Sequence, residues 1–336
     1  MNLAIVGATG NVGRKLIEVL EKKKISITKV HLVASSKSVG KKIIFSGEDH
    51  IVEDLETFDF SKVKIAFFAA GSAVAEKWGP KAAKNTIVID NSKYFRKDPE
   101  IPLIVPEVNS NELSKFKNKN IIANANCSVI PIVVALKPLH DLYNVKRIVA
   151  STYQSVSGVG KDGMDELISQ TREILENKNV TSKNFTKQIA FNAIPHIDSF
   201  LEDGSTKEER KNHDEIKKIL DKKINVTSTC VRVPVLVSHS ISANVEFNNK
   251  HNLEEIKNVL STSPGCKVID EHKDGGYITP VEAENKFDTF VSRIRNDTSQ
   301  PNTINMWIVS DNLLKGAALN AVEIAETLIN NNFYGK

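Results

Sequence analysis

Short apolar runs alternate with segments of helical spacing over the first third of the chain. Runs of strand length fall at residues 2–7, 30–35, 64–70 and 86–90, and helical spacing falls at residues 11–23 and 72–84. Strands and helices that alternate in this way predict a doubly wound parallel sheet with helices on both faces. We therefore expect a Rossmann-like N-terminal domain.

The pattern changes after residue 126. A helix is predicted to residue 143, followed by a strand at 147–156, helices near 165–177 and 207–221, and long strands at 225–235, 238–248, 289–297 and 303–310. Long strands with few helices between them predict a second, α+β domain with a largely antiparallel sheet. A last helix over 314–332 is expected to return to the first domain. The predicted domains are therefore 1–126 completed by 314–336, and 127–313.

Charge and cysteine content argue against several classes of protein. The chain has 336 residues, and 45 basic against 41 acidic side chains give a net charge of +4 that is spread along the length, so nucleic-acid binding is not expected. No apolar run is long enough to cross a membrane, and the first residues lead into a strand rather than a signal peptide, so we expect a cytoplasmic protein. Cys127, Cys230 and Cys266 have no CxxC spacing, which argues against a disulfide framework or a zinc site.

The first chemical motif is GATGNVG, residues 7–13, between a predicted strand and a predicted helix. Glycines there allow a tight turn, and the free amides at the helix start can bind a pyrophosphate. The spacing is GxxGxxG rather than the commoner GxGxxG, and such a turn can also be a simple strand-to-helix connection. We expect dinucleotide binding, with contacts from Gly7, Thr9, Gly10, Asn11, Val12 and Gly13.

The end of the second predicted strand indicates which dinucleotide binds. NAD enzymes usually place a carboxylate there for the ribose hydroxyls, whereas this chain reads ASSKSVGKK over residues 34–42, with hydroxyls and lysines and no acid. Lys37 and Ser38 are therefore expected to bind the 2′-phosphate of NADP. The alternative is a polar surface loop whose lysines are incidental.

Tyrosines and cysteines are the candidate reactive groups of this chain. Reductases with this type of glycine turn use a tyrosine with a lysine four residues later, but the residues four after Tyr94, Tyr143, Tyr153 and Tyr277 are Asp98, Arg147, Ser157 and Val281. Cys127 instead follows the predicted strand IIANAN and begins an apolar helix, whose positive end stabilises a thiolate nucleophile. A buried structural thiol is the alternative for Cys127, and it is the expectation for Cys230 and Cys266.

Further motifs follow in a particular order. After GATGNVG come DNSKYFRKDPEIPLIVPEVN, NANCSV, STYQSVSGVG, EERK, CVRVPVLVSHS and SDNLLKGAALNAVEIA. In this set and order the sequence resembles the aspartate-semialdehyde dehydrogenases over nearly its whole length. Ala125 stands where that family more commonly has proline, and Lys37 stands where many relatives have arginine, which keeps the cation but not the bidentate fork.

The resemblance implies an oxidoreductase that converts β-aspartyl phosphate to aspartate β-semialdehyde with NADPH and releases phosphate, a step of lysine, threonine and methionine synthesis. Cys127 would form a thioacyl enzyme, His239 matches the acid–base residue, and Gln154 matches the residue that orients the acyl group. Taken alone, His239 is more often a satisfied histidine on a strand, and a glutamine in a strand carries no signal.

The resemblance also implies which residues bind substrate and cofactor. Arg96 and Lys211 match phosphate-binding positions, Arg232 matches the α-carboxylate fork and Glu208 matches the partner of the α-amine. Glu208 and Lys211 share one face of a predicted helix, and an ordinary surface ion pair is the alternative. The positions near the dinucleotide are Ser72, Ser157, Gly158 and Asn312. No metal is predicted, because no carboxylate or second histidine is placed to join His196.

By the same resemblance, the first domain would bind NADP and the second would carry catalysis and dimerisation, in a homodimer or homotetramer that acts on small molecules. Two alternatives stay open: an N-acetyl-γ-glutamyl-phosphate reductase, and a catalytically silent dinucleotide-binding protein. The EERK motif and Arg232 favour a free amino acid as substrate, and the pair Cys127 and His239 argues against a silent protein.

Overall fold

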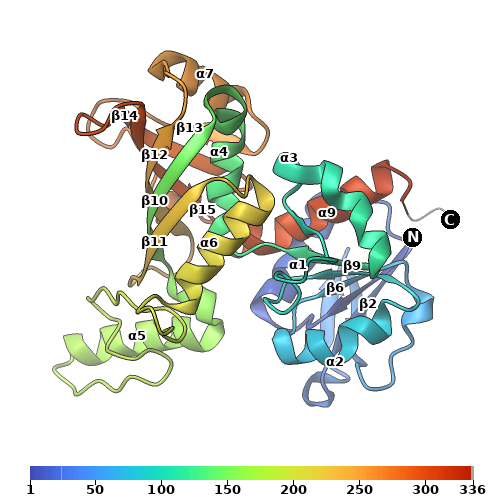
Figure 1. Ribbon diagram of the computed structural model, residues 1–336. Coiled ribbons are helices and arrows are strands. Elements are labelled where there is room, and N and C mark those ends of the chain that lie inside the picture. Colours follow the sequence, from blue (N-terminus) through green and yellow to red (C-terminus); the bar gives the residue numbers. More distant parts are fainter. Residues whose placement is uncertain (24, 334–336) are drawn as a thin grey trace. The chain divides into compact units, whose positions relative to one another are not determined.

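The computed structural model describes residues 1–23 and 25–333, which form two compact units (Figure 1). The first unit is Met1–Ala125 with Ala317–Lys336, and the second is Asn126–Gly316. Each unit is built around its own sheet.

The sheet of the first unit is wholly parallel. Its strands are β1 (Asn2–Val6), β2 (Lys29–Ala34), β5 (Glu53–Asp54), β6 (Ile65–Phe68), β7 (Ile87–Asp90), β8 (Leu103–Ile104) and β9 (Ile121–Asn124), in the order β5-β2-β1-β6-β7-β9-β8. Its helices are α1 (Asn11–Lys23), α2 (Ser72–Ala82), α3 (Pro106–Asn109) and α9 (Leu319–Asn330), with 3₁₀ turns η1 (Ser36–Ser38), η2 (Phe60–Lys62) and η3 (Ser110–Asn118). The predicted doubly wound sheet is confirmed.

Burial explains why these strands are almost continuously apolar. Helices α1 and α9 pack against each other, whereas α2 packs on β6 and β7, on the side of the sheet away from α9 (Figure 1). With both faces covered, all four residues of β6 are buried. The helices bury one stripe each, as Leu16, Ile17 and Leu20 do in α1.

A hairpin that the sequence pattern did not predict follows β2. Strands β3 (Lys42–Phe45) and β4 (Glu48–Ile51) pair as a separate two-stranded sheet. The residues between them, Ser46 and Gly47, have positive φ angles of 52° and 82°. Positive φ at both central positions is typical of the two-residue turn that best fits the twist of a hairpin.

The sheet of the second unit is mixed. Strands β10 (Val145–Gln154), β11 (Asn225–Arg232), β12 (His239–Phe247), β13 (Cys266–Val268), β14 (Thr289–Asn296) and β15 (Thr303–Ser310) lie in the order β11-β10-β12-β15-β14-β13. The pairs β10–β12, β12–β15 and β14–β15 are antiparallel, and β10–β11 and β13–β14 are parallel. Its helices are α4 (Val129–Tyr143), α5 (Lys161–Leu175), α6 (Lys207–Ile219), α7 (Leu253–Thr262) and α8 (Pro280–Ala283), with η4 (Val156–Val159).

One face of this sheet is covered by helices. Helix α4 packs between α6 and α7, and all three contact strands of the sheet. On β10 the residues alternate, so that Ile148, Ala150 and Thr152 are buried while Tyr153 is exposed. The face that carries Tyr153 also carries Trp307 of β15, and the two rings lie 5.5 Å apart.

The predicted single helix over 314–332 is corrected. A π-helical turn, η5 (Leu314–Ala318), comes first, and the α-helix begins only at Leu319. π-helical turns are frequent at functional sites. The structure gives a local reason for an irregular turn at this point, because Gly316 packs closely against Cys127.

Candidate active site

Cys127 lies in the turn between β9 and α4. The preceding residue, Asn126, caps this turn: its side-chain oxygen accepts a hydrogen bond from the Ser128 amide at 2.9 Å, and its carbonyl accepts from the amides of Val129 and Ile130. Cys127 is half-buried, and Cys230 and Cys266 are buried. Burial raises the pKa of the Cys230 thiol to about 12, so Cys230 stays protonated and unreactive.

His239 is the first residue of β12, and its ring faces Cys127. Its Nε2 atom lies 3.3 Å from Cys127 Sγ. On the other side of the ring, the backbone amide of Ser155 donates to Nδ1 at 3.1 Å. Burial and then the nearby charge of Arg232 lower the pKa of His239 to about 3, so the ring is neutral at physiological pH.

Glu208 and Lys211 are the centre of a buried polar cluster. Glu208 is 5% exposed, and its Oε2 atom accepts from Lys211 Nζ at 2.7 Å. Its Oε1 atom accepts from Asn126 at 3.1 Å and from Gln154 at 3.2 Å. Burial acts to raise the pKa of Glu208, but Lys211 and these hydrogen bonds outweigh it and hold the pKa below its usual value. The alternative of a surface ion pair is therefore wrong.

Arg232 lies at the end of β11 and is almost fully buried. Its guanidinium donates to the carbonyl oxygen of Ser155 at 2.6 Å. Burial lowers its pKa, and the charges of Glu208 and Cys127 act in the opposite direction, which places these three ionisable groups near one another. The second unit thus gathers a thiol, a neutral imidazole, a carboxylate and two cations.

Sequence reasoning missed several residues that hold this cluster. Ser128 donates to Asn212 at 2.6 Å, and the amide of Asn126 donates to Glu215 at 2.7 Å. Both acceptors lie on the same face of α6 as Glu208, at spacings of four and seven residues. Polar residues on the face that a helix buries were the signal that could have found them. Asp198, which binds Lys211 at 2.9 Å, lies in a loop and gave no such signal.

Two glycines leave room at the reactive groups. A Cβ atom on Gly316 would lie 3.0 Å from the Cβ atom of Cys127. A Cβ atom on Gly158 would lie 3.0 Å from an Arg232 nitrogen and 3.7 Å from His239 Nε2. Gly158 belongs to the motif that we expected near the dinucleotide, and the structure gives it this additional reason to lack a side chain.

Asn312 and Ser157 belong to one buried network. The Asn312 side-chain oxygen accepts from Ser155 Oγ at 3.1 Å, from Ser157 Oγ at 3.2 Å and from the Ser238 amide at 2.9 Å. The Asn312 side chain therefore fixes the loop beside His239. Contact of Ser157 and Asn312 with a dinucleotide stays a prediction.

The glycine turn of the first unit has the form of a phosphate cradle. Gly7 has a φ of +89°, and a Cβ atom there would lie 2.6 Å from the Ala69 carbonyl oxygen. A Cβ atom on Gly13 would lie 2.2 Å from the Gly7 carbonyl oxygen, so this glycine allows α1 to start tightly against the turn. Among the residues that the structure describes, the buried side-chain nitrogen of Asn11 has no hydrogen-bond partner. A pyrophosphate at the start of α1 would supply the acceptor that this nitrogen lacks.

The loop after β2 holds the residues expected at the 2′-phosphate. Lys37 is exposed, whereas Ser38 is buried. The Ser38 hydroxyl lies 3.4 Å from Thr9 Oγ1 and accepts from Lys41 Nζ at 3.5 Å. Lys41 is thus a second cation beside Ser38 that we did not single out from the sequence.

Ser72 and Arg96 also belong to the first unit. Ser72 is the first residue of α2 and is half-buried. Arg96 is buried and donates to the carbonyl oxygens of Asn124 at 2.8 Å and Asn91 at 3.1 Å. Burial raises the pKa of nearby Asp90 to about 6, and the charge of Arg96 acts against that shift.

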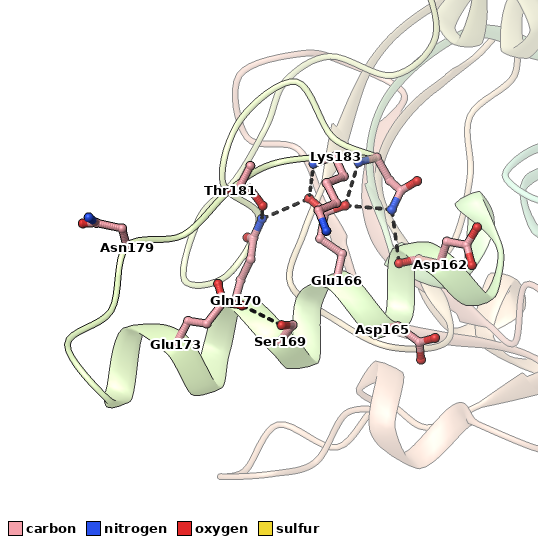
Figure 2. Close-up of a pocket in the computed structure, with 10 residues that line it drawn as sticks. Asp162, Asp165, Glu166, Ser169, Gln170, Glu173, Asn179, Thr181 and Lys183 are labelled. Carbon is pink, nitrogen blue, oxygen red and sulfur yellow. Dashed lines mark hydrogen bonds between the residues drawn. The ribbon is translucent and has the colours of Figure 1, made fainter.

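A separate hollow of about 590 Å³ lies between α5 and the loop that follows it (Figure 2). Glu166 ties this loop to the helix, because its carboxylate accepts from the amides of Lys183 at 3.0 Å and Asn184 at 2.6 Å. The hollow contains none of the predicted site residues. Over residues 1–23 and 25–333, no group of three or more His, Cys, Asp or Glu side chains is arranged to hold a metal ion. Within the same residues, no helix has both the length and the apolar character needed to span a membrane.

Comparisons with known proteins agree with this geometry. The chain matches the families described as semialdehyde dehydrogenase, NAD binding domain, over residues 2–116, and semialdehyde dehydrogenase, dimerisation domain, over residues 136–315. It is 49% identical to the aspartate-semialdehyde dehydrogenase of Rickettsia typhi over 331 residues, which cover 98% of each chain. The solved structure of aspartate semialdehyde dehydrogenase II from Vibrio cholerae is similar with a TM-score of 0.96 at 45% identity and 98% coverage of each chain. A complex of that enzyme with ASA is similar with a TM-score of 0.96 at 44% identity, again over 98% of each chain.

Proposed function

The chain belongs to the aspartate-semialdehyde dehydrogenase family, and we propose that it reduces L-aspartyl 4-phosphate to L-aspartate 4-semialdehyde through a thioacyl enzyme on Cys127. This reaction serves the synthesis of lysine, through diaminopimelate, and of threonine and methionine. The observation that carries the proposal is the 3.3 Å distance between Cys127 Sγ and His239 Nε2, beside buried Glu208 and Arg232 and half-buried Lys211.

Cys127 is the proposed nucleophile. Its thiolate would attack the acyl carbon and displace phosphate, which divides one difficult reduction into two easier steps. Arg232 is close enough to Cys127 for their charges to interact, and the thiolate is favoured beside a cation and at the start of a helix. The nicotinamide cofactor, when bound, supplies the hydride that reduces the thioester. His239, whose Nε2 atom lies 3.3 Å from Cys127 Sγ, is the proposed acid–base residue of thiol activation and of thiohemiacetal collapse.

Each charged residue is proposed to bind a different group of the substrate. Arg232 would bind the α-carboxylate as a planar fork, and Glu208 would bind the α-amine, which fits a free amino acid better than an N-acetylated one. Lys211 and Arg96 would bind the phosphate. Gln154, whose amide nitrogen reaches Glu208 at 3.2 Å, would orient the acyl group.

The first domain matches a nicotinamide-dinucleotide-binding family, and we propose NADP as the cofactor. The exposed cation Lys37 and nearby Lys41 support this choice, because a 2′-phosphate needs positive charge where NAD enzymes have a carboxylate. Residues 1–126 with 314–336 would bind NADP, through the glycine turn and Ser72, and residues 127–313 would carry catalysis. Ser157, Gly158 and Asn312 are the proposed contacts of the second domain with the dinucleotide.

The second domain matches a dimerisation family, and we propose a homodimer rather than a larger assembly. The sheet face that carries Tyr153 and Trp307 is not covered by α4, α6 or α7, and aromatic residues are enriched at such interfaces. Light scattering should give twice the chain mass of 37.2 kDa, and Tyr153→Asp should shift the mass towards one chain. A wild-type protein of one chain mass at micromolar concentration would contradict the homodimer.

One assay tests the proposed reaction in reverse. Reduction of NADP should require both phosphate and aspartate semialdehyde, and N-acetyl-glutamate semialdehyde should be a much poorer substrate. Equal or faster turnover of the acetylated aldehyde would favour the alternative reductase. Cofactor binding without any turnover would favour the silent protein.

A further inference from the structure

A hollow of about 420 Å³ lies in the first unit, at the amino-terminal ends of three neighbouring strands. Lys64, Thr86 and Asn120 all line it, and they are the residues immediately before β6, β7 and β9. Because these strands are parallel, their amino-terminal ends lie at one edge of the sheet. The glycine turn follows the carboxyl end of β1, at the opposite edge. The hollow is therefore separate from the turn that we expect to bind a dinucleotide.

The charged side chains that line this hollow are all positive. Among the lining residues that the structure describes are three lysines, Lys64, Lys84 and Lys117, and no acidic residue. Lys64 and Lys84 are exposed, and their ammonium groups form no ion pair or hydrogen bond within the described residues. Lys117 Nζ lies 5.9 Å from the centre of the Phe333 ring. Three cations without a counter-charge favour the binding of an anion.

The buried lining residues supply apolar rings and a hydroxyl without a partner. Phe116 is 3% exposed, and its ring meets that of Phe333 at 72°, with 6.1 Å between the ring centres. Thr86 is 5% exposed, and its hydroxyl has no hydrogen-bond partner among the residues that the structure describes. A buried hydroxyl that bonds to nothing is destabilising. An acceptor bound in the hollow would give this hydroxyl a partner.

The charges in the hollow favour a phosphate group over a carboxylate. A phosphate monoester carries a charge of about −1.5 to −2 near neutral pH, whereas a carboxylate carries a single negative charge. Lysine binds phosphate as a point charge and needs no fixed bidentate geometry. A volume of about 420 Å³ lies within the roughly 300–1,000 Å³ of small-molecule sites and exceeds what inorganic phosphate occupies. The space beside Phe116 and Phe333 therefore suits an apolar ring attached to the phosphate.

We propose that this hollow is a further binding site of the chain, and that its ligand is a small molecule with a phosphate group attached to an apolar ring. The three lysines bind the phosphate, the Thr86 hydroxyl donates a hydrogen bond to it, and the two phenylalanine rings contact the apolar part. The site takes no part in the reaction proposed above, so the inference does not depend on that function.

Pyridoxal 5′-phosphate is the first probe, because it joins a phosphate to an aromatic ring and its aldehyde forms an imine with a lysine amine. Reduction with borohydride makes the label permanent, and peptide mapping locates it. Binding of the phosphate holds the aldehyde beside the amines, so label should enter Lys64, Lys84 or Lys117 roughly tenfold faster than Lys29. Lys29 is the internal control, because it is exposed at the start of β2, at the same edge of the sheet, and does not line the hollow. Labelling of Lys29 as fast as the three lysines would overturn the proposal.

Competition with unreactive compounds identifies the chemistry that the hollow recognises. Phenyl phosphate should slow labelling of the three lysines, inorganic phosphate should do so only at higher concentration, and phenol should have no effect. NADP, at a concentration that just saturates the protein, should leave this labelling unchanged, because the glycine turn lies at the opposite edge of the sheet. Protection by NADP, or no protection by phenyl phosphate, would overturn the proposal. Equal protection by phenyl phosphate and inorganic phosphate would overturn the part assigned to the ring.

A matched pair of variants tests whether the lysines act on one ligand. Lys84→Gln should raise the concentration of phenyl phosphate that half-protects Lys64 and Lys117 roughly threefold, as expected when one exposed charge is lost. Lys29→Gln removes the same charge from the same edge of the sheet and should leave this concentration unchanged. The same concentration in both variants would show that the lysines do not share a site.

Thr86→Val tests the part played by the hydroxyl. This substitution keeps the shape of the side chain and removes a buried hydroxyl without a partner, so the free protein should be at least as thermally stable as wild type. Half-protection of the three lysines should then need roughly tenfold more phenyl phosphate, as expected for the loss of a hydrogen bond to a charged group. Unchanged protection in Thr86→Val would overturn the part assigned to this hydroxyl.

Discussion

Cys127 Sγ and His239 Nε2 lie 3.3 Å apart, although 112 residues separate them in the chain. The first residue belongs to a strand-to-helix turn and the second begins a strand of the second sheet. Their approach depends on α6, whose buried face binds Asn126 and Ser128 beside the cysteine, and on Ser155, which binds the far side of the imidazole. The reactive pair is therefore a product of tertiary structure, and the predictions below test its parts.

The cofactor prediction concerns Lys37. Lys37→Glu should lower the ratio of kcat/KM for NADPH over NADH at least tenfold, because a carboxylate would repel the 2′-phosphate and could bind the ribose hydroxyls instead. The matched control is Lys42→Glu, the same charge change on the neighbouring hairpin, where Lys42 pairs with Asp49. Steady-state kinetics with both cofactors measure the effect. A ratio that is the same in both variants would contradict the assignment of this loop.

The substrate prediction separates Lys211 from Arg232. Lys211→Ala should weaken phosphate binding, so that raised phosphate in the reverse assay restores part of the activity. Arg232→Ala should lose on the order of a hundredfold in kcat/KM and recover little, because it misplaces the acyl carbon and also removes the donor to the Ser155 carbonyl. Equal recovery of the two variants at high phosphate would contradict this division of roles.

The packing prediction concerns Gly316. Gly316→Ala would place a methyl group 3.0 Å from the Cys127 Cβ atom, so the cysteine turn must shift by a few tenths of an ångström. We expect kcat to fall about tenfold or more, because small displacements of reacting groups are costly. Gly79→Ala is the control, since its methyl would meet the Phe95 ring at 2.9 Å in the first unit. It should reduce thermal stability without changing the alkylation rate of Cys127. Equal alkylation rates in both variants would show that Gly316 does not position the thiol.

The pH prediction follows from the buried neutral ring of His239. The pKa of this histidine falls from 6.5 to about 3 on folding, so below pH 6.5 the unfolded chain binds a proton that the folded protein excludes. The stability that comes from keeping the His239 ring neutral is therefore fully present above pH 6.5 and is lost as the pH falls below that value. When the pH falls from about 7.5 to 5, the free energy of unfolding should decrease in wild type, and the decrease should be roughly 2 kcal/mol smaller in His239→Gln. Urea unfolding at the two pH values measures this difference, and parallel losses in the two proteins would show that His239 can be protonated in the folded state.

Much of the fold could be predicted from periodicity. The helix over residues 11–23 and the strand over 303–310 were predicted with their observed ends, because apolar spacing marks a buried face directly. The β3–β4 hairpin and α7 were missed although local signals existed. Ser46 and Gly47 form a two-residue turn, and Asn252 caps α7 through the amides of Glu254 and Glu255. These elements are short or exposed, so their apolar periodicity is too weak to indicate a helix or a strand.

The candidate site was less accessible to sequence reasoning. Cys127 could be singled out from its place before a helix, and the glycine turn and Lys37 from their places after predicted strands, whereas the other catalytic and substrate-binding residues came from a family resemblance. Asn212 and Glu215 carried a helical-face signal that was missed, whereas Ser155 could not be assigned, because its role depends on partners far away in the sequence. A buried hydrogen bond joins groups that the fold brings together, and no local spacing encodes it.

The central claim is that Cys127 is the reacting group, and it is tested by comparing alkylation at each cysteine with the activity that remains. Treatment with iodoacetamide should modify Cys127 first, because Cys230 and Cys266 are buried and burial raises the pKa of the Cys230 thiol to about 12. Activity should fall in proportion to the label at Cys127, and bound phosphate with NADP should slow both changes together. Full modification of Cys127 with activity retained, or loss of activity that follows the label at Cys230 while Cys127 stays unmodified, would contradict the account.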